Sequence, residues 1–280
     1  MGSKFMQKFN RGLVIFFLVI ICLVVLYPLV YVASAAVNPG SSVANLSIIP
    51  FQHVTFSHFV DLFTNPAYNY GRWFLNTLIV ASATSASTLL VASLSAYAFS
   101  RFHFSFKKPL MLALLILQVF PSIVAMIAIY MILYRFGLLD NLWGLVLIYL
   151  AGNIPYNVWM VKSYMDTIPR SLDEAARIDG AGNFRIWATI VMPMAKPILT
   201  FLALTSFTAP WMEYIFSKLV LRSNSNFTLA LGLYTFVTDK VNKFTTFAAG
   251  AIIIAIPFII FFVLTQKMLV TSLGGAAVKE

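Results

Sequence analysis

Long stretches without charge dominate the pattern of hydrophobic and polar positions in this chain. No Asp, Glu, Lys or Arg occurs within residues 73–100, 109–134, 141–161 or 244–266. A helix of about 20 residues, rising roughly 1.5 Å per residue, crosses the roughly 30 Å hydrocarbon layer of a membrane. Each stretch is long enough for that, and two further apolar segments resemble them. The pattern predicts six transmembrane helices, near residues 13–37, 74–99, 110–133, 141–161, 197–217 and 245–266.

The composition indicates the same fold class. Of the 280 residues, 60% are hydrophobic and 10% are charged, whereas soluble domains carry about 25% charged residues. So few charges cannot cover the surface of a soluble globule of this size. We therefore expect an all-α polytopic membrane protein in which residues 1–280 form a single transmembrane domain. The lone cysteine, Cys22, lies in the first apolar segment, so no intrachain disulfide is possible.

The net charge of +10 could reflect nucleic-acid binding, but that function needs a basic face or stripe. Here the basic residues are scattered between the apolar segments, as in the cytoplasmic loops of membrane proteins. With a cytoplasmic N-terminus, 13 of the 19 Lys and Arg residues lie on the cytoplasmic side. These are Lys4, Lys8, Arg11, Arg101, Lys107, Lys108, Lys162, Arg170, Arg177, Arg185, Lys196, Lys267 and Lys279. This asymmetry predicts that both termini are cytoplasmic.

The longest cytoplasmic segment, residues 162–196, differs from the rest of the chain in its polar composition. Ser171 and Glu174 form a capping-box pattern, in which each side chain accepts a hydrogen bond from the other residue's backbone amide. The helix that begins there should end at Gly180, because glycine readily adopts the left-handed turn conformation.

A second short helix is expected from about residue 183 to residue 192, before Pro193. We expect both helices to lie parallel to the membrane. Ala175 and Ala176 leave a low-profile face that would let another protein approach closely. The local pattern alone favours an ordinary interfacial linker, and a docking surface for another protein is the alternative on these grounds.

Six positions in this segment resemble the EAA motif of ABC-importer permeases. The family pattern is E-A-A, three residues, G, nine residues, I, one residue, L-P. The matching residues are Glu174, Ala175, Ala176, Gly180, Ile190 and Pro193, with Asp179 directly before the glycine. The spacing agrees throughout, and the one departure is Met192 in place of leucine, which is apolar and of similar size.

The resemblance covers nearly the whole chain and is strongest to the smaller permease subunit of maltose/maltodextrin-type carbohydrate importers. The segments that carry it are residues 76–78, 96–102, 117–121, 179–181, 247–251, 256–257 and 274–280. The resemblance implies a six-span ABC type I importer permease fold with a cytoplasmic helical coupling loop. It also implies that the chain forms half of the path for a carbohydrate, such as maltodextrin or another oligosaccharide.

The resemblance further implies a set of partners. These are a second permease subunit, two cytoplasmic ABC ATPases and an extracytoplasmic sugar-binding protein, in a bacterial or archaeal cell membrane. The helix with the EAA residues would dock in a cleft of an ATPase. ATP and Mg would be bound by those ATPases and no cofactor by this chain, because the sequence contains no G-x-x-x-x-G-K-[ST] phosphate loop. The sequence also shows no nucleophile–base pair and no metal cluster, so we expect no enzyme activity.

Polar groups inside the predicted spans are candidates for the translocation path. Glu213 is the only acid there, and an ionisable group in a membrane costs at least about 2–3 kcal/mol unless it faces water or a partner. It could line the path beside a kink at Pro210. It could equally be a structural carboxylate, paired with Lys218 or with a neighbouring helix. Gln118 and Asn153 are further candidates for sugar contacts, although buried amides more often bridge helices.

The outer segment at about residues 218–244 contains candidate contacts for the binding protein. On the resemblance, these are Tyr234, Asp239 and Lys240, although the segment also suits a plain solvated loop. Two other functions remain open: a stand-alone secondary carrier with Glu213 as an ion relay, and a structural membrane scaffold. The EAA segment distinguishes the importer permease from both, since neither a carrier nor a scaffold needs an ATPase-docking helix.

Overall fold

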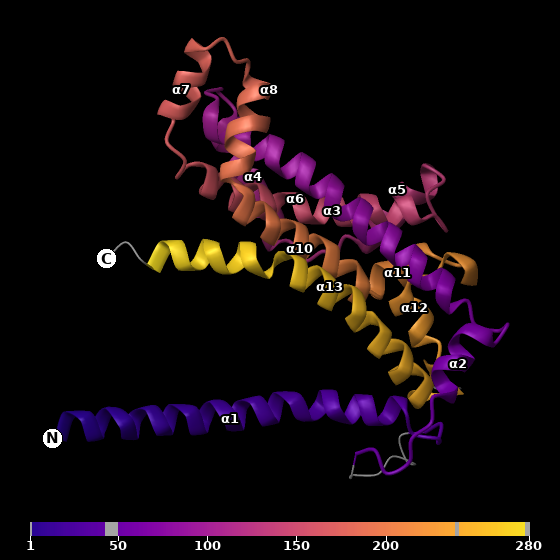
Figure 1. The fold of residues 1–280 in the computed structure, drawn as a ribbon. Helices are drawn as coiled ribbons and strands as arrows, with labels where there is room; N and C mark the ends of the chain where they lie inside the picture. Colours follow the sequence, from indigo (N-terminus) through magenta and orange to yellow (C-terminus); the bar gives the residue numbers. More distant parts are fainter. Residues whose placement is uncertain (1, 43–49, 239–240, 278–280) are drawn as a thin grey trace. The chain divides into compact units, whose positions relative to one another are not determined.

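A computed structural model describes the backbone of residues 2–42, 50–238 and 241–277, and the side chains of residues 10–42, 50–238 and 242–266. The described chain is almost entirely helical (Figure 1). Its helices are α1 (Gly2–Ala36), α2 (Ser57–Thr64), α3 (Tyr70–Arg101), α4 (Lys107–Val119), α5 (Met126–Arg135), α6 (Leu142–Met165), α7 (Ser171–Ile178), α8 (Asn183–Ile186), the π-helical η2 (Trp187–Val191), α9 (Met192–Met194), α10 (Lys196–Met212), α11 (Ile215–Val220), the 3₁₀ turn η3 (Asn224–Asn226), α12 (Leu229–Tyr234) and α13 (Phe244–Ala277). Strands β1 (Val237–Thr238) and β2 (Val241–Asn242) form an antiparallel pair.

The chain divides into two units, and residues 1–70 with 233–255 form the first. In this unit the Tyr70 hydroxyl donates to the Gly250 carbonyl oxygen at 2.8 Å. The His58 ring Nε2 lies 2.8 Å from the Asn38 carbonyl oxygen, which accepts its hydrogen bond. In the most apolar part of α1, the described residues bury 0% of the residues. Such a helix needs lipid or another protein around it.

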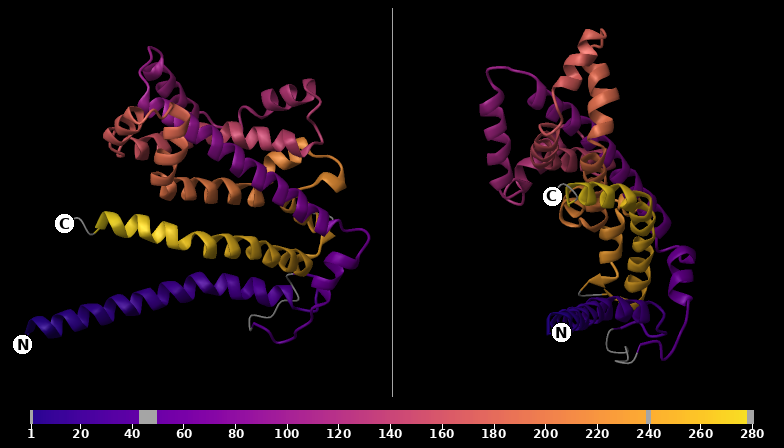
Figure 2. Two further views of the ribbon diagram at one scale, coloured as in Figure 1. Left: turned by 45° about the horizontal axis from the view of Figure 1, so that its top comes forward. Right: turned by 60° about the vertical axis from the view of Figure 1, so that its left-hand side comes forward.

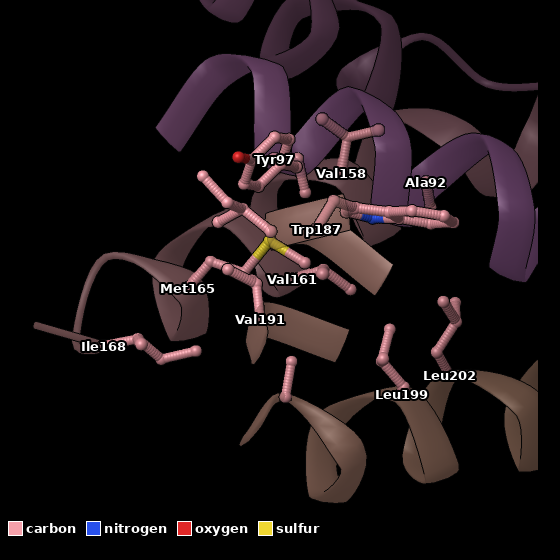
Figure 3. Close-up of a cluster of buried hydrophobic side chains, with 13 residues drawn as sticks. Ala92, Tyr97, Val158, Val161, Met165, Ile168, Trp187, Val191, Leu199 and Leu202 are labelled. Atoms are coloured by element: carbon pink, nitrogen blue, oxygen red, sulfur yellow. The ribbon is translucent and has the colours of Figure 1, made fainter. Parts of the chain in front are cut away.

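Residues 71–232 with 256–280 form the second unit. A buried apolar cluster joins helices α3, α6, α8, η2 and α10 of this unit, and Figure 3 shows its side chains. Tyr97 of α3, Met165 of α6, Trp187 of η2 and Leu199 of α10 contribute to it. Figures 1 and 2 show α7 and α8 next to each other at one end of this unit. The cluster therefore lies beside the loop that the sequence analysis singled out.

The third predicted span, residues 110–133, is not one continuous helix. Helix α4 ends at Val119, Phe120 is extended with a ψ of 122°, and α5 begins at Met126. Pro121 explains the break, because proline has no amide hydrogen and disfavours helical backbone at the residue before it. With 13 and 10 residues, α4 and α5 are each shorter than a membrane-spanning helix.

The fifth predicted span, residues 197–217, is wrong at its far end. Helix α10 stops at Met212, Glu213 is extended with a ψ of 119°, and α11 begins at Ile215. Pro210 has no amide hydrogen, so one carbonyl of α10 lacks its helical donor. After the break, the Glu213 carboxylate accepts hydrogen bonds from amides at the start of α11.

The membrane class is confirmed, but the count of six spans is not. Among the described residues, 4 helices are long and apolar enough to cross a membrane, or 5 if α8–α9 and α10 form one span bent by 83°. The difference arises mainly from the break between α4 and α5, which an uncharged run of residues does not reveal.

Two glycines of α6 give a test of packing in the second unit. A Cβ at Gly144 would lie 2.5 Å from the Leu138 carbonyl oxygen, whereas at Gly152 no described atom lies within 4 Å. Gly144→Ala should therefore lower the free energy of unfolding by about 1–3 kcal/mol through overpacking. Gly152→Ala should raise it slightly, by up to about 1 kcal/mol, through helix propensity. Thermal unfolding of the purified variants measures both, and equal shifts would contradict the packing around Gly144.

Candidate functional site

The loop between α6 and α10 contains the EAA residues, and its turn has the expected geometry. Gly180 has a φ of +80°, which confirms the predicted left-handed conformation. The Gly180 amide donates to the Arg177 carbonyl at 3.0 Å, and the Ala181 amide donates to the Ala176 carbonyl at 2.9 Å. This pair of bonds is the Schellman ending of a helix. Helix α7 thus ends in a rigid turn that directs the chain into α8.

The predicted capping box at the start of α7 is wrong. Among the described residues no side chain caps this helix, and Ser171 is its first helical residue. The reason is the backbone of Arg170, which is already helical with φ −69° and ψ −22°, whereas a capping residue needs an extended conformation. The Glu174 amide instead donates to the Arg170 carbonyl at 3.1 Å. The Glu174 side chain is exposed.

Helix α7 has one buried face and one exposed apolar face. Asp173 is buried, and Ala176 packs in part against the cluster of Figure 3. On the other face Leu172, Ala175 and Ile178 follow each other at three-residue spacing, and the Ile178 side chain is 88% exposed. Such spacing places the three side chains in one row. Because this row lies outside the predicted spans, it is a candidate surface for contact with another protein.

Helix α8 extends this exposed surface. Phe184 is 71% exposed, and its ring centroid lies 5.2 Å from that of Trp187 in η2. We call Leu172, Ala175, Ile178 and Phe184 the docking face. The sequence analysis missed Leu172, Ile178 and Phe184, because it followed the EAA letters. The three-residue spacing of apolar residues along α7, on the face away from Asp173, was the signal that could have identified Leu172 and Ile178.

The remaining EAA residues have different positions. Asp179 is exposed and is the last residue before the glycine turn. Ile190 lies in η2 and packs against the buried cluster, while Pro193 in α9 is exposed. The chain then bends by 83° between α9 and α10. Ile190 therefore attaches the loop to the helices, and Asp179 and Pro193 face away from that core.

A buried ion pair fixes the other end of α7. The Arg101 Nε lies 2.6 Å from the Asp173 Oδ2, and the two side chains are 2% and 3% exposed. Arg101 also donates to the carbonyl oxygens of Met165 and Ile168, each at 3.1 Å. The sequence analysis did not identify either charged partner, since nothing local to position 101 or 173 shows that the two meet.

The three path candidates line two adjoining grooves of the second unit. Glu213 and Asn153 line a groove of about 680 Å³ together with Tyr149. Gln118, at the end of α4, lines a groove of about 700 Å³ with Tyr156. The two grooves share the lining residues Ser122, Ile129, Ala151 and Gly152. The structure therefore brings these candidates to neighbouring parts of one surface.

Glu213 has a clear structural role beside its place in the groove wall. Its carboxylate accepts hydrogen bonds from the Tyr149 hydroxyl at 2.6 Å and from the amides of Phe216 at 2.8 Å and Ser217 at 3.1 Å. These amides belong to the first turn of α11, which has no helical acceptors for them. The carboxylate thus joins α6 to α11 and closes the break after α10.

The loop residues at the predicted outer side form a second polar cluster. The Asp140 carboxylate accepts hydrogen bonds from the amides of Arg222 at 2.9 Å and Ser223 at 3.0 Å, and from the Ser223 hydroxyl. Desolvation raises the pKa of the Asp140 carboxyl, but these hydrogen bonds outweigh it and lower the pKa to about 2. Asp140 therefore fastens the α5–α6 loop to residues 222–223.

The candidate contacts for a binding protein are only partly described. Tyr234 is exposed at the end of α12. Asp239 and Lys240 lie outside the described residues.

A family model, curated relatives and a solved structure that resemble this chain all come from membrane transport systems. The family described as "binding-protein-dependent transport system inner membrane component" matches residues 88–274. The galactooligosaccharides transport system permease protein GanQ of Bacillus subtilis is 38% identical over 264 residues, which cover 94% of this chain and 93% of that protein. The maltodextrin transport system permease protein MdxG of the same organism is 38% identical over 280 residues, covering 100% of both. A chain of a bacterial ABC transporter that imports the polysaccharide alginate has a similar fold, with a TM-score of 0.79 at 23% identity, covering 93% of this chain and 96% of that chain.

The capping role of Glu213 leads to a prediction. In Glu213→Gln one oxygen becomes an NH₂ group that faces donors, which leaves a buried donor unpaired and should lower the free energy of unfolding by about 1–3 kcal/mol. Glu174→Gln is the control, because the Glu174 side chain is exposed. Thermal unfolding followed by circular dichroism measures both variants. An unchanged unfolding temperature in Glu213→Gln would rule out the capping role.

Proposed function

Because this chain belongs to the family of binding-protein-dependent transport system inner membrane components, we propose that it forms half of the path by which an ABC importer moves an oligosaccharide into the cell. The chain is thus a membrane permease subunit and not an enzyme. The observation that carries the substrate class is the 38% identity, over the full length of both chains, to a permease for maltodextrin. A galactooligosaccharide permease of equal identity supports the wider class.

The chemistry of the grooves agrees with a sugar substrate. Amide and hydroxyl groups of Gln118, Asn153 and Ser122 can exchange hydrogen bonds with sugar hydroxyls, and Tyr156 offers an aromatic face to a sugar ring. The polar groups are few among apolar neighbours, which suits a path that must also release its cargo. The Tyr149 hydroxyl donates a hydrogen bond to the Glu213 carboxylate, and in this proposal Glu213 shapes the wall of the groove.

The proposed complex contains a second permease subunit, two cytoplasmic ATPases and an external sugar-binding protein. ATP and Mg are bound by the ATPases. The docking face of this chain contacts one ATPase, with Glu174, Asp179 and Pro193 around it. Tyr234, Asp239 and Lys240 contact the binding protein on the opposite side of the membrane.

Both termini lie in the cytoplasm in this proposal. The excess of Lys and Arg on one side supports it, and the exposed apolar docking face requires the same side for the ATPase. Association with a cytoplasmic ATPase, as measured below, tests this orientation, since a docking loop outside the cell would meet no ATPase.

The docking face gives a matched pair of variants. Phe184 is 71% exposed on the docking face, and Phe106 is 72% exposed in the predicted cytoplasmic loop between α3 and α4. Burial of one phenylalanine contributes about 1.5–3 kcal/mol, so Phe184→Ser should weaken ATPase binding about 10- to 100-fold. Phe106→Ser should leave binding unchanged. The measurement is the amount of ATPase that co-purifies with each tagged permease variant at increasing salt concentration and washing time. Equal retention in both variants would show that the ATPase docks elsewhere.

The substrate class is tested by transport into vesicles. The permease, co-expressed with its partner subunits and binding protein, should accumulate radiolabelled maltodextrin or galactooligosaccharide in an ATP-dependent manner. A labelled amino acid serves as the control cargo and should not accumulate. Accumulation that persists without the ATPases, driven by an ion gradient, would support a secondary carrier and refute the importer function.

A further inference from the structure

Arg101 is a buried charge at the point where three parts of the second unit meet. It is the last residue of α3, and its side chain is 2% exposed. Its guanidinium binds Asp173 of α7 at 2.6 Å, the Met165 carbonyl at the end of α6 at 3.1 Å, and the Ile168 carbonyl at 3.1 Å. A buried charge is costly unless it is paired and hydrogen-bonded. Asp173 pairs with the charge of Arg101, and the carbonyls of Met165 and Ile168 accept hydrogen bonds from it. Among the described residues neither Asp173 oxygen accepts a hydrogen bond, so the ion pair alone holds this carboxylate.

The neighbouring residue makes the junction tighter. The Ser100 hydroxyl donates to the Asp166 Oδ1 at 2.7 Å, and the Ser100 carbonyl accepts from the Arg170 Nη2 at 2.9 Å. Desolvation raises the pKa of the Asp166 carboxyl, but hydrogen bonds from Lys162 and Ser100, with the charges of Lys162 and Lys107, outweigh it and lower the pKa. Two adjacent residues of α3 thus bind the α6–α7 connector at Asp166, Ile168 and Arg170 and bind α7 at Asp173.

The connector itself is not helical between Met165 and Ser171, so it could bend if nothing held it. The planar guanidinium has five donors in a fixed arrangement. It can bind a carboxylate and two carbonyl groups at once, and a lysine ammonium cannot reproduce that geometry. The link between α7 and the helices therefore runs through Arg101 as well as along the chain.

We propose that Arg101, through its ion pair with Asp173, is the positioning residue that transmits displacement of α7 to α3 and α6. This inference rests on the proposed function, in which an ATPase moves α7. When α7 moves, the ion pair carries α3 along, and the bonds to Met165 and Ile168 carry α6. Without Arg101, α7 still binds the ATPase through its docking face, but the connector bends and α3 and α6 do not follow the displacement of α7.

The experiment separates transmission from mere stabilisation. Asp173→Asn keeps the shape and removes the charge, and Arg101→Lys keeps a charge and removes the fixed geometry. Both should retain ATPase co-purification and lower the sugar transported per ATP hydrolysed about tenfold, within the range found for coupling residues. Lys108→Gln is the control, because the Lys108 side chain of α4 is exposed and is not among the residues of this junction. It should transport normally.

A double variant decides between the two roles. Replacing both partners of a buried ion pair by apolar residues is often neutral or stabilising for the fold, so Arg101→Met with Asp173→Leu should unfold at the parental temperature. If Arg101 transmits motion, transport per ATP stays low in this variant despite normal stability. If transport returns together with stability, or if Asp173→Asn and Arg101→Lys transport normally, the inference is wrong. A parental complex that binds no ATPase or moves no labelled maltodextrin would instead refute the proposed function.

Discussion

The absence of water in the hydrocarbon layer means that every backbone amide and carbonyl must find a partner within the protein. Continuous helices meet this need along most of the chain, so the interruptions are informative. At each of two interruptions a single side chain takes over. The Glu213 carboxylate binds the amides of Phe216 and Ser217 where α10 ends and α11 begins. Outside that layer, at the predicted cytoplasmic end of α6, the protein itself excludes water, and the buried Arg101 guanidinium binds the carbonyls of Met165 and Ile168.

The sequence correctly predicted the features that depend on residues close together in the chain, which are the long helices and the turn at Gly180. Uncharged runs located the long helices α3, α6 and α13, and the glycine at position 180 predicted its own positive φ. The capping box failed although its letters were correct, because the backbone of Arg170 is helical and continues into α7. Asp173, next to the expected cap, is drawn into the ion pair with Arg101. That contact joins residues far apart in the sequence, so no local pattern contains it.

The same limit applies to the grooves. The sequence identified Glu213, Gln118 and Asn153 as polar groups in apolar surroundings, and all three line the grooves. It could not show that residues of the α4–α5 break, such as Ser122, line both grooves, or that Tyr149 donates a hydrogen bond to the Glu213 carboxylate. The small residues Ala151 and Gly152, shared by both grooves, leave space that larger side chains would fill.

Helix α6 connects the loop that contains the EAA residues with the grooves. Its last residue, Met165, accepts from Arg101 and lies in the buried cluster beside η2, while Gly152 and Asn153 form part of the groove walls. Thirteen residues of helix, at roughly 1.5 Å each, separate Met165 from Gly152 by about 20 Å. Helix α6 is continuous over this length, with Pro155 inside it. In the proposed function, motion imposed on α7 by an ATPase reaches the grooves through two connections, the Arg101 junction and α6 itself.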